Sequence, residues 1–304
     1  MDELEIIRNW QMPGLRIFLN TVDYRTSHFH PEWELIWILE NRLTVTLLQQ
    51  EMTAAPGQLL LFSPNIPHEF RKVSAPATFL CLQIRTGLFP GLDGLSIDEY
   101  LPEKAMDTAP LRLAMAQAAA VCFRREPFFE LKALSIVSRI FYSLFTALPG
   151  HRVTPEEQQS LERRNARLVR LQHYVDENYM HTLRLTDFAL LEGLSVSYLS
   201  HFIKDSLNQT FQEYVENVRF NCACKLIASG RKGMLDVCME SGFSDYRYFS
   251  RAFQRRFGMT PEQYCISRSS EPQDDVSVRR SLHSLERFYT SSQSLEYMKH
   301  LGLL

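Results

Sequence analysis

The sequence lacks the features that define several common classes of protein. Its 304 residues contain six cysteines but no Cys-x-x-Cys pair, so neither a zinc ribbon nor a thioredoxin-like redox site is indicated. No apolar run approaches the roughly 18 residues that cross a bilayer. The opening Met-Asp-Glu-Leu-Glu is acidic where a secretion signal would be basic. We therefore expect reduced thiols, no membrane partner and a cytoplasmic location.

Neither sign of charge is in large excess. The chain has 33 Lys and Arg against 35 Asp and Glu, a net charge of -2, which excludes a generally polybasic protein. Residues 1–162 carry 14 basic and 19 acidic side chains, whereas residues 163–268 carry 15 and 11. An acidic front and a basic rear indicate that the rear contacts a polyanion. The length is about twice that of a usual domain and predicts two domains.

The front of the chain has the pattern of short strands. Alternating or β-branched runs occur at residues 15–19, 34–39, 43–48, 59–62 and 78–84. Short strands at this spacing predict a small antiparallel barrel or sandwich. Helical periodicity follows between residues 111 and 148. Its apolar face either packs on the barrel or forms the seam of a homodimer, and the residues alone leave both open.

A segment that connects the two halves begins near residue 154. Thr154 and Glu157 have the spacing of a capping box, and Pro155 occupies the first helical position between them. From residue 165 to residue 268 the pattern is helical with short turns. This part holds the most informative feature of the sequence.

That feature is an internal near-repeat of about 50 residues. In each copy a small residue, Ala189 or Cys238, lies four positions before a glycine, Gly193 or Gly242. The small residue permits two helices to cross closely, and the glycine takes the positive φ that ends a helix. An apolar residue and a serine follow, so each copy predicts a helix-turn-helix unit.

The second helix of each unit has an outward stripe of small, polar and basic residues. We expect Ser195 and Ser244 to be its N-caps. The outward positions are Ser197, Ser200, His201 and Lys204 in the first unit and Tyr246, Arg247, Ser250, Arg251 and Gln254 in the second. One such stripe alone is also typical of a solvated surface. Two of them, separated by a helix over residues 211–227, favour recognition helices about one DNA turn (~34 Å) apart and a double-stranded DNA partner.

Residues from about 165 to 266 resemble the DNA-binding domain of AraC/XylS-family transcription regulators. The closest stretch is GFSDYRYFSRAFQRRFGMTPEQY, from Gly242 to Tyr264. Cys238 departs from the usual alanine, a small-for-small change. The resemblance implies that eight residues read or line the DNA groove, namely Ser197, Ser200, His201, Lys204, Tyr246, Arg247, Ser250 and Arg251.

A second cluster of chemical interest lies in the front half. His28, His30 and Glu34 have the spacing His-x-His-x3-Glu, and His68 follows a strand and a turn. Residues 28, 30 and 34 have the same parity and would share one face of an extended strand. Three His and one Glu suit Zn, Fe, Mn or Ni. These stretches resemble the cupin fold and the sensor domain that precedes AraC-type DNA-binding units. The residues could hold a metal, line an effector pocket, or serve only as core hydrogen-bond partners.

The sequence therefore predicts a two-domain α+β protein. We expect a cupin-like effector-binding domain over residues 1–100 and a helical dimerisation or linker segment over 101–160. The two helix-turn-helix units fall in 161–268, and residues 269–304 form a linker and an amphipathic tail without an assigned role.

The favoured hypothesis is a ligand-responsive transcription regulator, not an enzyme, with no cofactor. The resemblance implies a homodimer, a small-molecule effector such as a sugar, and activation through contact with RNA polymerase. The alternative is a metal-dependent cupin enzyme or a metal sensor that uses His28, His30, Glu34 and His68.

Overall fold

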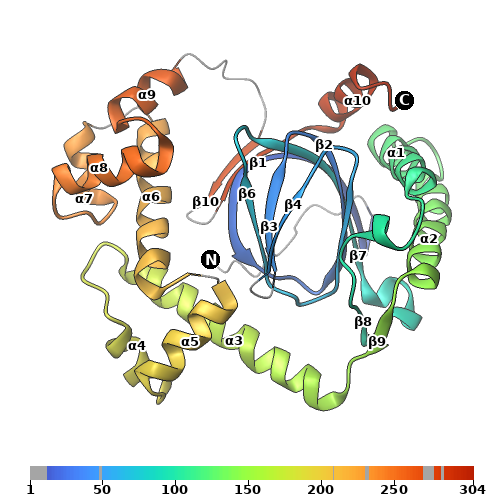
Figure 1. The fold of residues 1–304 in the computed structure, drawn as a ribbon. Coiled ribbons are helices and arrows are strands. Elements are labelled where there is room, and N and C mark those ends of the chain that lie inside the picture. Colours follow the sequence, from blue (N-terminus) through green and yellow to red (C-terminus); the bar gives the residue numbers. More distant parts are fainter. Residues whose placement is uncertain (1–11, 48–49, 208, 230–232, 270–276, 282–283) are drawn as a thin grey trace. The chain divides into compact units, whose positions relative to one another are not determined.

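The computed structural model describes residues 12–47, 50–207, 209–229, 233–269, 277–281 and 284–304 (Figure 1). The chain divides into two compact units. The barrel unit holds the residues up to Ala166 together with 286–304, and the helical unit begins at Arg167 and holds the helices up to Ser269. Among the described residues, no helix combines the length and apolar character needed to cross a membrane. The expected fold class, an antiparallel barrel and an all-helical domain, is confirmed.

The barrel unit is built on a nine-stranded sheet that forms a nearly closed barrel. The strands on its main path are β1 (Leu15–His28), β2 (Glu32–Glu40), β3 (Leu43–Leu47), β4 (Gln50–Ala54), β5 (Leu59–Phe62), β6 (His68–Lys72) and β7 (Ala77–Arg85). Their order is β4-β3-β6-β1-β7-β2-β5, and β11 also pairs with β1. The long strand β1 pairs with two neighbouring strands: Leu15–Val22 pairs with β7, and the later residues of β1 pair with β6.

Both faces of this sheet are buried, which explains the near-continuous apolar run of β2. Leu35 and Trp37 belong to a core that includes the helices outside the barrel. Ile36 and Ile38, which alternate with them, belong to the core inside the barrel. Both kinds of position therefore favour large apolar side chains.

The helices α1 (Ala109–Arg124) and α2 (Phe129–Ala147) cover the outer face of the sheet, as Figure 1 shows. Short elements precede or follow them, namely η1 (Thr86–Leu88), η2 (Pro90–Leu92), β8 (Leu95–Ile97), η3 (Pro102–Lys104) and β9 (Gly150–Arg152). Met115 and Leu144 are fully buried in the core shared with the sheet. The apolar stripe of these helices thus packs on the barrel, while Leu131 and Tyr142 stay exposed.

The helical unit contains seven helices in its described part, of which the first starts in the barrel unit. They are α3 (Pro155–Asn178), α4 (Leu185–Glu192), α5 (Val196–Leu207), α6 (Phe211–Ser229), α7 (Met234–Glu240), α8 (Tyr246–Phe257) and α9 (Pro261–Ser269). The predicted capping box at α3 is confirmed, because the Thr154 amide donates to Glu157 at 2.8 Å and the Glu157 amide donates to Thr154 Oγ1 at 3.2 Å.

The turn of each helix-turn-helix unit forms at its glycine, with φ of 64° at Gly193 and 85° at Gly242. The Ser195 hydroxyl caps α5 by accepting from the Tyr198 amide at 3.2 Å, as predicted. The prediction for Ser244 is wrong. Asp245 caps α8 instead, since its carboxylate accepts from the Tyr248 amide at 2.6 Å. A carboxylate at this position also interacts favourably with the positive end of the helix dipole.

Residues 269–304, predicted as a linker and an amphipathic tail, form regular elements in their described part. This part contains β10 (Ser277–Ser281), β11 (Ser284–Phe288) and α10 (Ser291–His300). The strand β11 pairs with β1, and α10 lies against α1 with Met298 fully buried. Residues 270–276 and 282–283 of the predicted linker and tail lie outside the described residues.

The two turn glycines differ in what surrounds them, and this gives a matched pair of variants. A Cβ at residue 242 would lie 2.5 Å from the carbonyl oxygen of Tyr179, whereas nothing lies within 4 Å of one at residue 193. Gly193→Ala should lower the free energy of unfolding by about 1 kcal/mol, because alanine is strained in the left-handed backbone conformation. Gly242→Ala should cost about 3 kcal/mol, because steric crowding adds to that strain. Urea unfolding followed by helical circular dichroism measures both; equal losses would contradict the steric role.

Candidate nucleic-acid interface and buried histidine cluster

The predicted outward stripe on α5 faces solvent. Ser197, Ser200, His201 and Lys204 are exposed, while Leu199, Phe202 and Ile203 on the opposite side are buried. His201 Nδ1 lies 2.7 Å from the carbonyl oxygen of Ser197, so the ring donates its Nδ1 proton there. This tautomer leaves Nε2 as an acceptor. The helix therefore presents hydroxyls, an imidazole acceptor and a cation along one side.

On α8 the basic residues that were predicted to contact DNA are exposed, and two other predicted contact residues are half-buried. Arg247 and Arg251 are exposed and Ser250 is half-buried. Tyr246 is half-buried: its ring packs against Phe249 at 6.0 Å between centroids, and its hydroxyl donates to Glu262 near the surface. Burial, and then the bond to Glu262, raise the pKa of Tyr246. Its observed role is to hold α8 against α9.

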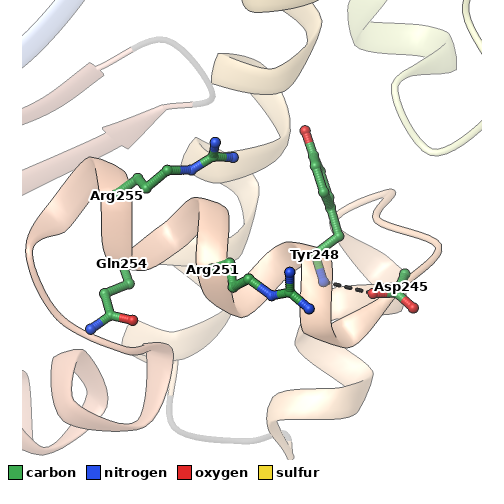
Figure 2. Close-up of a pocket in the computed structure, with 5 residues that line it drawn as sticks. All are labelled: Asp245, Tyr248, Arg251, Gln254 and Arg255. Atoms are coloured by element: carbon green, nitrogen blue, oxygen red, sulfur yellow. Dashed lines mark hydrogen bonds between the residues drawn. The ribbon is translucent and has the colours of Figure 1, made fainter.

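A groove of about 670 Å³ runs along α8 (Figure 2). Its lining residues are Asp245, Tyr248, Arg251, Gln254 and Arg255. Of these residues, Arg251 was predicted to read or line the DNA groove and Gln254 to lie in the outward stripe. Arg255 follows Arg251 at one helical turn, so the repeat of arginines every four residues from Arg247 was the signal that could have found it. Figure 2 shows the side chains of Arg251, Gln254 and Arg255 projecting from this helix.

Polar contacts fix the position of α8 on α6, the helix that connects the two helix-turn-helix units. The Tyr248 hydroxyl donates to Glu216 Oε1 of α6 at 2.7 Å. This bond is the main cause that raises the pKa of Tyr248. One helical turn further along α6, the Arg219 guanidinium donates to the carbonyl oxygens of Tyr179 and His181, each at 2.8 Å. The recognition helices thus belong to one braced unit.

In the barrel unit, His28, His30, Glu34 and His68 converge. One ligand atom from each lies within 4.8 Å of all the others, and all four residues are buried. The parity argument for this convergence is wrong, because a bend separates β1, which ends at His28, from β2, which begins at Glu32. Sheet pairing brings the residues together instead, since His28 of β1 lies opposite His68 of β6.

The ring tautomers direct lone pairs into the cluster. His28 Nδ1 lies 3.1 Å from the Thr26 carbonyl oxygen and His68 Nδ1 lies 2.9 Å from that of Ile66, so both rings donate through Nδ1. The His28 Nε2 atom is buried without a hydrogen-bond partner. Burial lowers the pKa of His68 and lowers that of His28 well below its usual value. Both rings are therefore neutral at pH 7, the form that binds metals.

Glu34 is the anionic member of the cluster. Its Oε1 accepts from Gln83 Nε2 at 2.9 Å and from Cys81 Sγ at 3.1 Å. Its Oε2 lies 3.3 Å from His30 Nε2 and 3.1 Å from His68 Nε2. Burial favours the neutral acid, but the interactions with His30 first, and then with His68, outweigh it and hold the pKa of Glu34 well below its usual range. The residue is an ionised carboxylate with one oxygen oriented by Gln83 and Cys81.

These donors fit a divalent transition metal. Three imidazoles and one carboxylate are a ligand set that zinc and other first-row metals accept. Backbone carbonyls that accept from the far ring nitrogen are the usual supports of metal-bound histidine. The set therefore has both the ligands and the orienting partners that such a site needs.

Comparison with known proteins agrees with both halves of this description. A family model described as a helix-turn-helix domain matches residues 188–265, and one described as a cupin domain matches residues 22–83. The chain combines an AraC-type helix-turn-helix domain with a cupin domain, as the resemblance predicted.

Individual relatives are similar over different lengths. The chain is 28% identical to "Probable transcriptional regulator LumQ" of Photobacterium leiognathi over 254 residues, which covers 83% of this chain and 96% of LumQ. It is 31% identical to the virulence regulon transcriptional activator VirF of Yersinia enterocolitica over 94 residues, 31% of this chain and 35% of VirF. The match thus spans about a third of VirF. A structure of ToxT from Vibrio cholerae aligns at 13% identity and a TM-score of 0.42 over 83% of this chain and 97% of ToxT, and no conclusion rests on it.

Proposed function

We propose that this protein is a transcription regulator that binds duplex DNA through α5 and α8 and responds to a small ligand in its cupin domain. The observation that carries the proposal is the pair of exposed polar and basic stripes within one braced helical unit. Each stripe lies on the second helix of a helix-turn-helix unit, the element that enters the major groove. The regulatory relatives support the same class of function.

The side chains suit different tasks on DNA. Arg247 and Arg251 have the forked donors that pair with guanine, and Gln254 suits adenine. Lys204 and Arg255 suit phosphate, which positions the protein without reading sequence. The imidazole acceptor of His201 suits a base-edge amino group. Base reading is thus concentrated on α8.

The finer parts of the proposal concern regulation. We propose that the regulator is an activator that contacts RNA polymerase and works as a homodimer. The exposed Leu131 and Tyr142 on α2 leave an apolar surface for such a dimer. We also propose that the effector bound in the barrel is a sugar-like small molecule.

A second candidate function concerns the cluster of His28, His30, Glu34 and His68. The unpartnered Nε2 atom of His28 and the ionised Glu34 favour a bound divalent metal as the ligand that the cupin domain senses. Bound there, the ion would supply two positive charges to a buried anionic site. The same residues would serve the rival metal-dependent enzyme, but the helix-turn-helix pair favours regulation.

The reading role of Arg251 has a direct test. Arg251→Ala should reduce the discrimination at one base pair of the selected duplex by about 1–3 kcal/mol of binding free energy, because a bidentate contact to guanine is lost. Duplexes selected from a random pool with the wild-type chain, measured by fluorescence anisotropy, provide the affinities. Arg124→Ala, an exposed arginine on α1, is the matched control. An unchanged affinity and base preference would remove Arg251 from this role.

Lys204 should behave differently, since a phosphate contact carries no sequence information. Lys204→Ala should weaken binding about equally for selected and mismatched duplexes, and should reduce the slope of log affinity against log salt by about 1. Titrations at several salt concentrations measure that slope. A loss confined to one base position would instead assign Lys204 to base reading.

The metal candidate predicts one bound ion per chain in untagged protein purified without chelator. Elemental analysis measures the content, and titration with zinc alone measures affinity. Glu34→Gln should weaken zinc binding at least tenfold, because it removes the only anionic ligand of the cluster. His151→Gln, an exposed histidine of β9, should leave both values unchanged. Substoichiometric metal in the wild-type protein, with no zinc uptake, would contradict this candidate.

A further inference from the structure

The chain enters and leaves the DNA-binding helices through the barrel unit. The helix α3 starts in the barrel unit, and after α9 the described residues 286–304 belong to the barrel unit again. The strand β11 joins the sheet beside β1, where the Tyr289 amide donates to the carbonyl oxygen of Leu19 at 3.2 Å. The strand β6 pairs only with the later residues of β1. The edge of β1 that β6 leaves open is therefore covered by the end of the chain.

A buried carboxylate anchors this end of the chain. Glu286 is 2% exposed, its Oε1 accepts from Asn20 Nδ2 at 2.8 Å and lies 3.6 Å from Arg25 Nη1. Asn20 is fully buried and Arg25 is nearly so. A buried charge needs such partners, because an unpaired one is costly. Loss of the Glu286 carboxylate would leave the buried Asn20 amide and Arg25 guanidinium without this partner, so the docked state depends on this polar contact.

Further contacts extend the docking along β11 and α10. The Tyr289 hydroxyl lies 3.0 Å from Thr21 Oγ1, Phe288 packs on Phe18 at 5.5 Å between ring centroids, and the Tyr297 hydroxyl donates to Glu40. Several of these groups are half-buried or exposed and can exchange their partners for water. One buried contact together with several partly exposed contacts is typical of a segment that opens locally.

We infer that residues 284–304 are a releasable strap that ties the far end of the helical unit to the barrel unit and restrains DNA binding. The inference rests on the proposed function, since the restraint acts on the DNA-binding helices. With the strap docked, these helices lie between two attachments; with it released, only α3 remains. Arg25 also lies three residues before His28 on β1, so the anchor and the histidine cluster share a strand.

The docking is tested by hydrogen exchange on the full chain. Glu286→Ala should speed exchange of the amides in β11 and α10 at least tenfold, while Glu296→Ala, at an exposed position of α10, should leave it unchanged. Tyr297→Phe removes one hydroxyl and no buried charge, so it keeps the test valid if Glu286→Ala misfolds; it should speed exchange of α10 about threefold. Exchange equal to that of the wild type in both variants would overturn the strap.

The restraint is tested by affinity for the duplex selected with the wild-type chain. Strap release in Glu286→Ala should lower the dissociation constant at least threefold, and Glu296→Ala should not change it; a higher dissociation constant in Glu286→Ala would overturn the restraint. Faster exchange with an affinity within twofold of the wild type would overturn the restraint while leaving DNA binding established. A wild-type chain that selects no duplex would contradict the proposed function and the restraint together, whereas the exchange measurement still decides docking.

Discussion

The packing of the helical unit depends on the contact among Arg219 of α6, Gly242 in the second turn and the residues that follow α3. The Arg219 guanidinium donates to the carbonyl oxygens of Tyr179 and His181, and the backbone of Gly242 lies so close that a side chain there would meet both Tyr179 and Arg219. One arginine thus joins the entry helix, the connecting helix and the second turn. Because α8 starts directly after that turn, its direction is set by this junction. The direction in which the exposed stripe of α8 points therefore depends on this junction.

Much of the barrel could be predicted because its strands carry large apolar side chains. All five strand runs named from the sequence correspond to strands, since burial on both faces selects continuous apolar residues. The strands β4 and β6 were missed. Strand β4 is Gln-Glu-Met-Thr-Ala and mostly exposed at one end of the strand order, and β6 contains Glu69, Arg71 and Lys72. Pairing with neighbours, rather than local pattern, makes them strands.

The site residues were found from the sequence for reasons of differing quality. The exposed stripe of α5 followed from helical periodicity, and the structure has the same orientation. The bond from Tyr246 to Glu262 could not be predicted, because Glu262 lies on another helix and periodicity does not reveal such a contact. The histidine cluster was named correctly although the parity argument was wrong, since pairing of β1 and β6 creates it. The amphipathic pattern of the tail did not reveal where it docks, because Glu286 and its partner Asn20 are 266 positions apart.

The histidine cluster poses a charge problem that a single proton cannot solve. The Ile66 carbonyl takes the Nδ1 proton of His68, so the Nε2 lone pair faces the Glu34 carboxylate at 3.1 Å. A proton on His68 Nε2 would make an imidazolium, against the direction in which burial shifts the pKa of His68, and a proton on Glu34 would oppose the direction in which its neighbours shift the pKa of that carboxyl. Either proton would also leave the buried Nε2 of His28 without a partner. A multivalent cation placed among the four residues would satisfy the carboxylate and the imidazole lone pairs together, which is why the ligand geometry favours a metal over a purely structural set of hydrogen bonds.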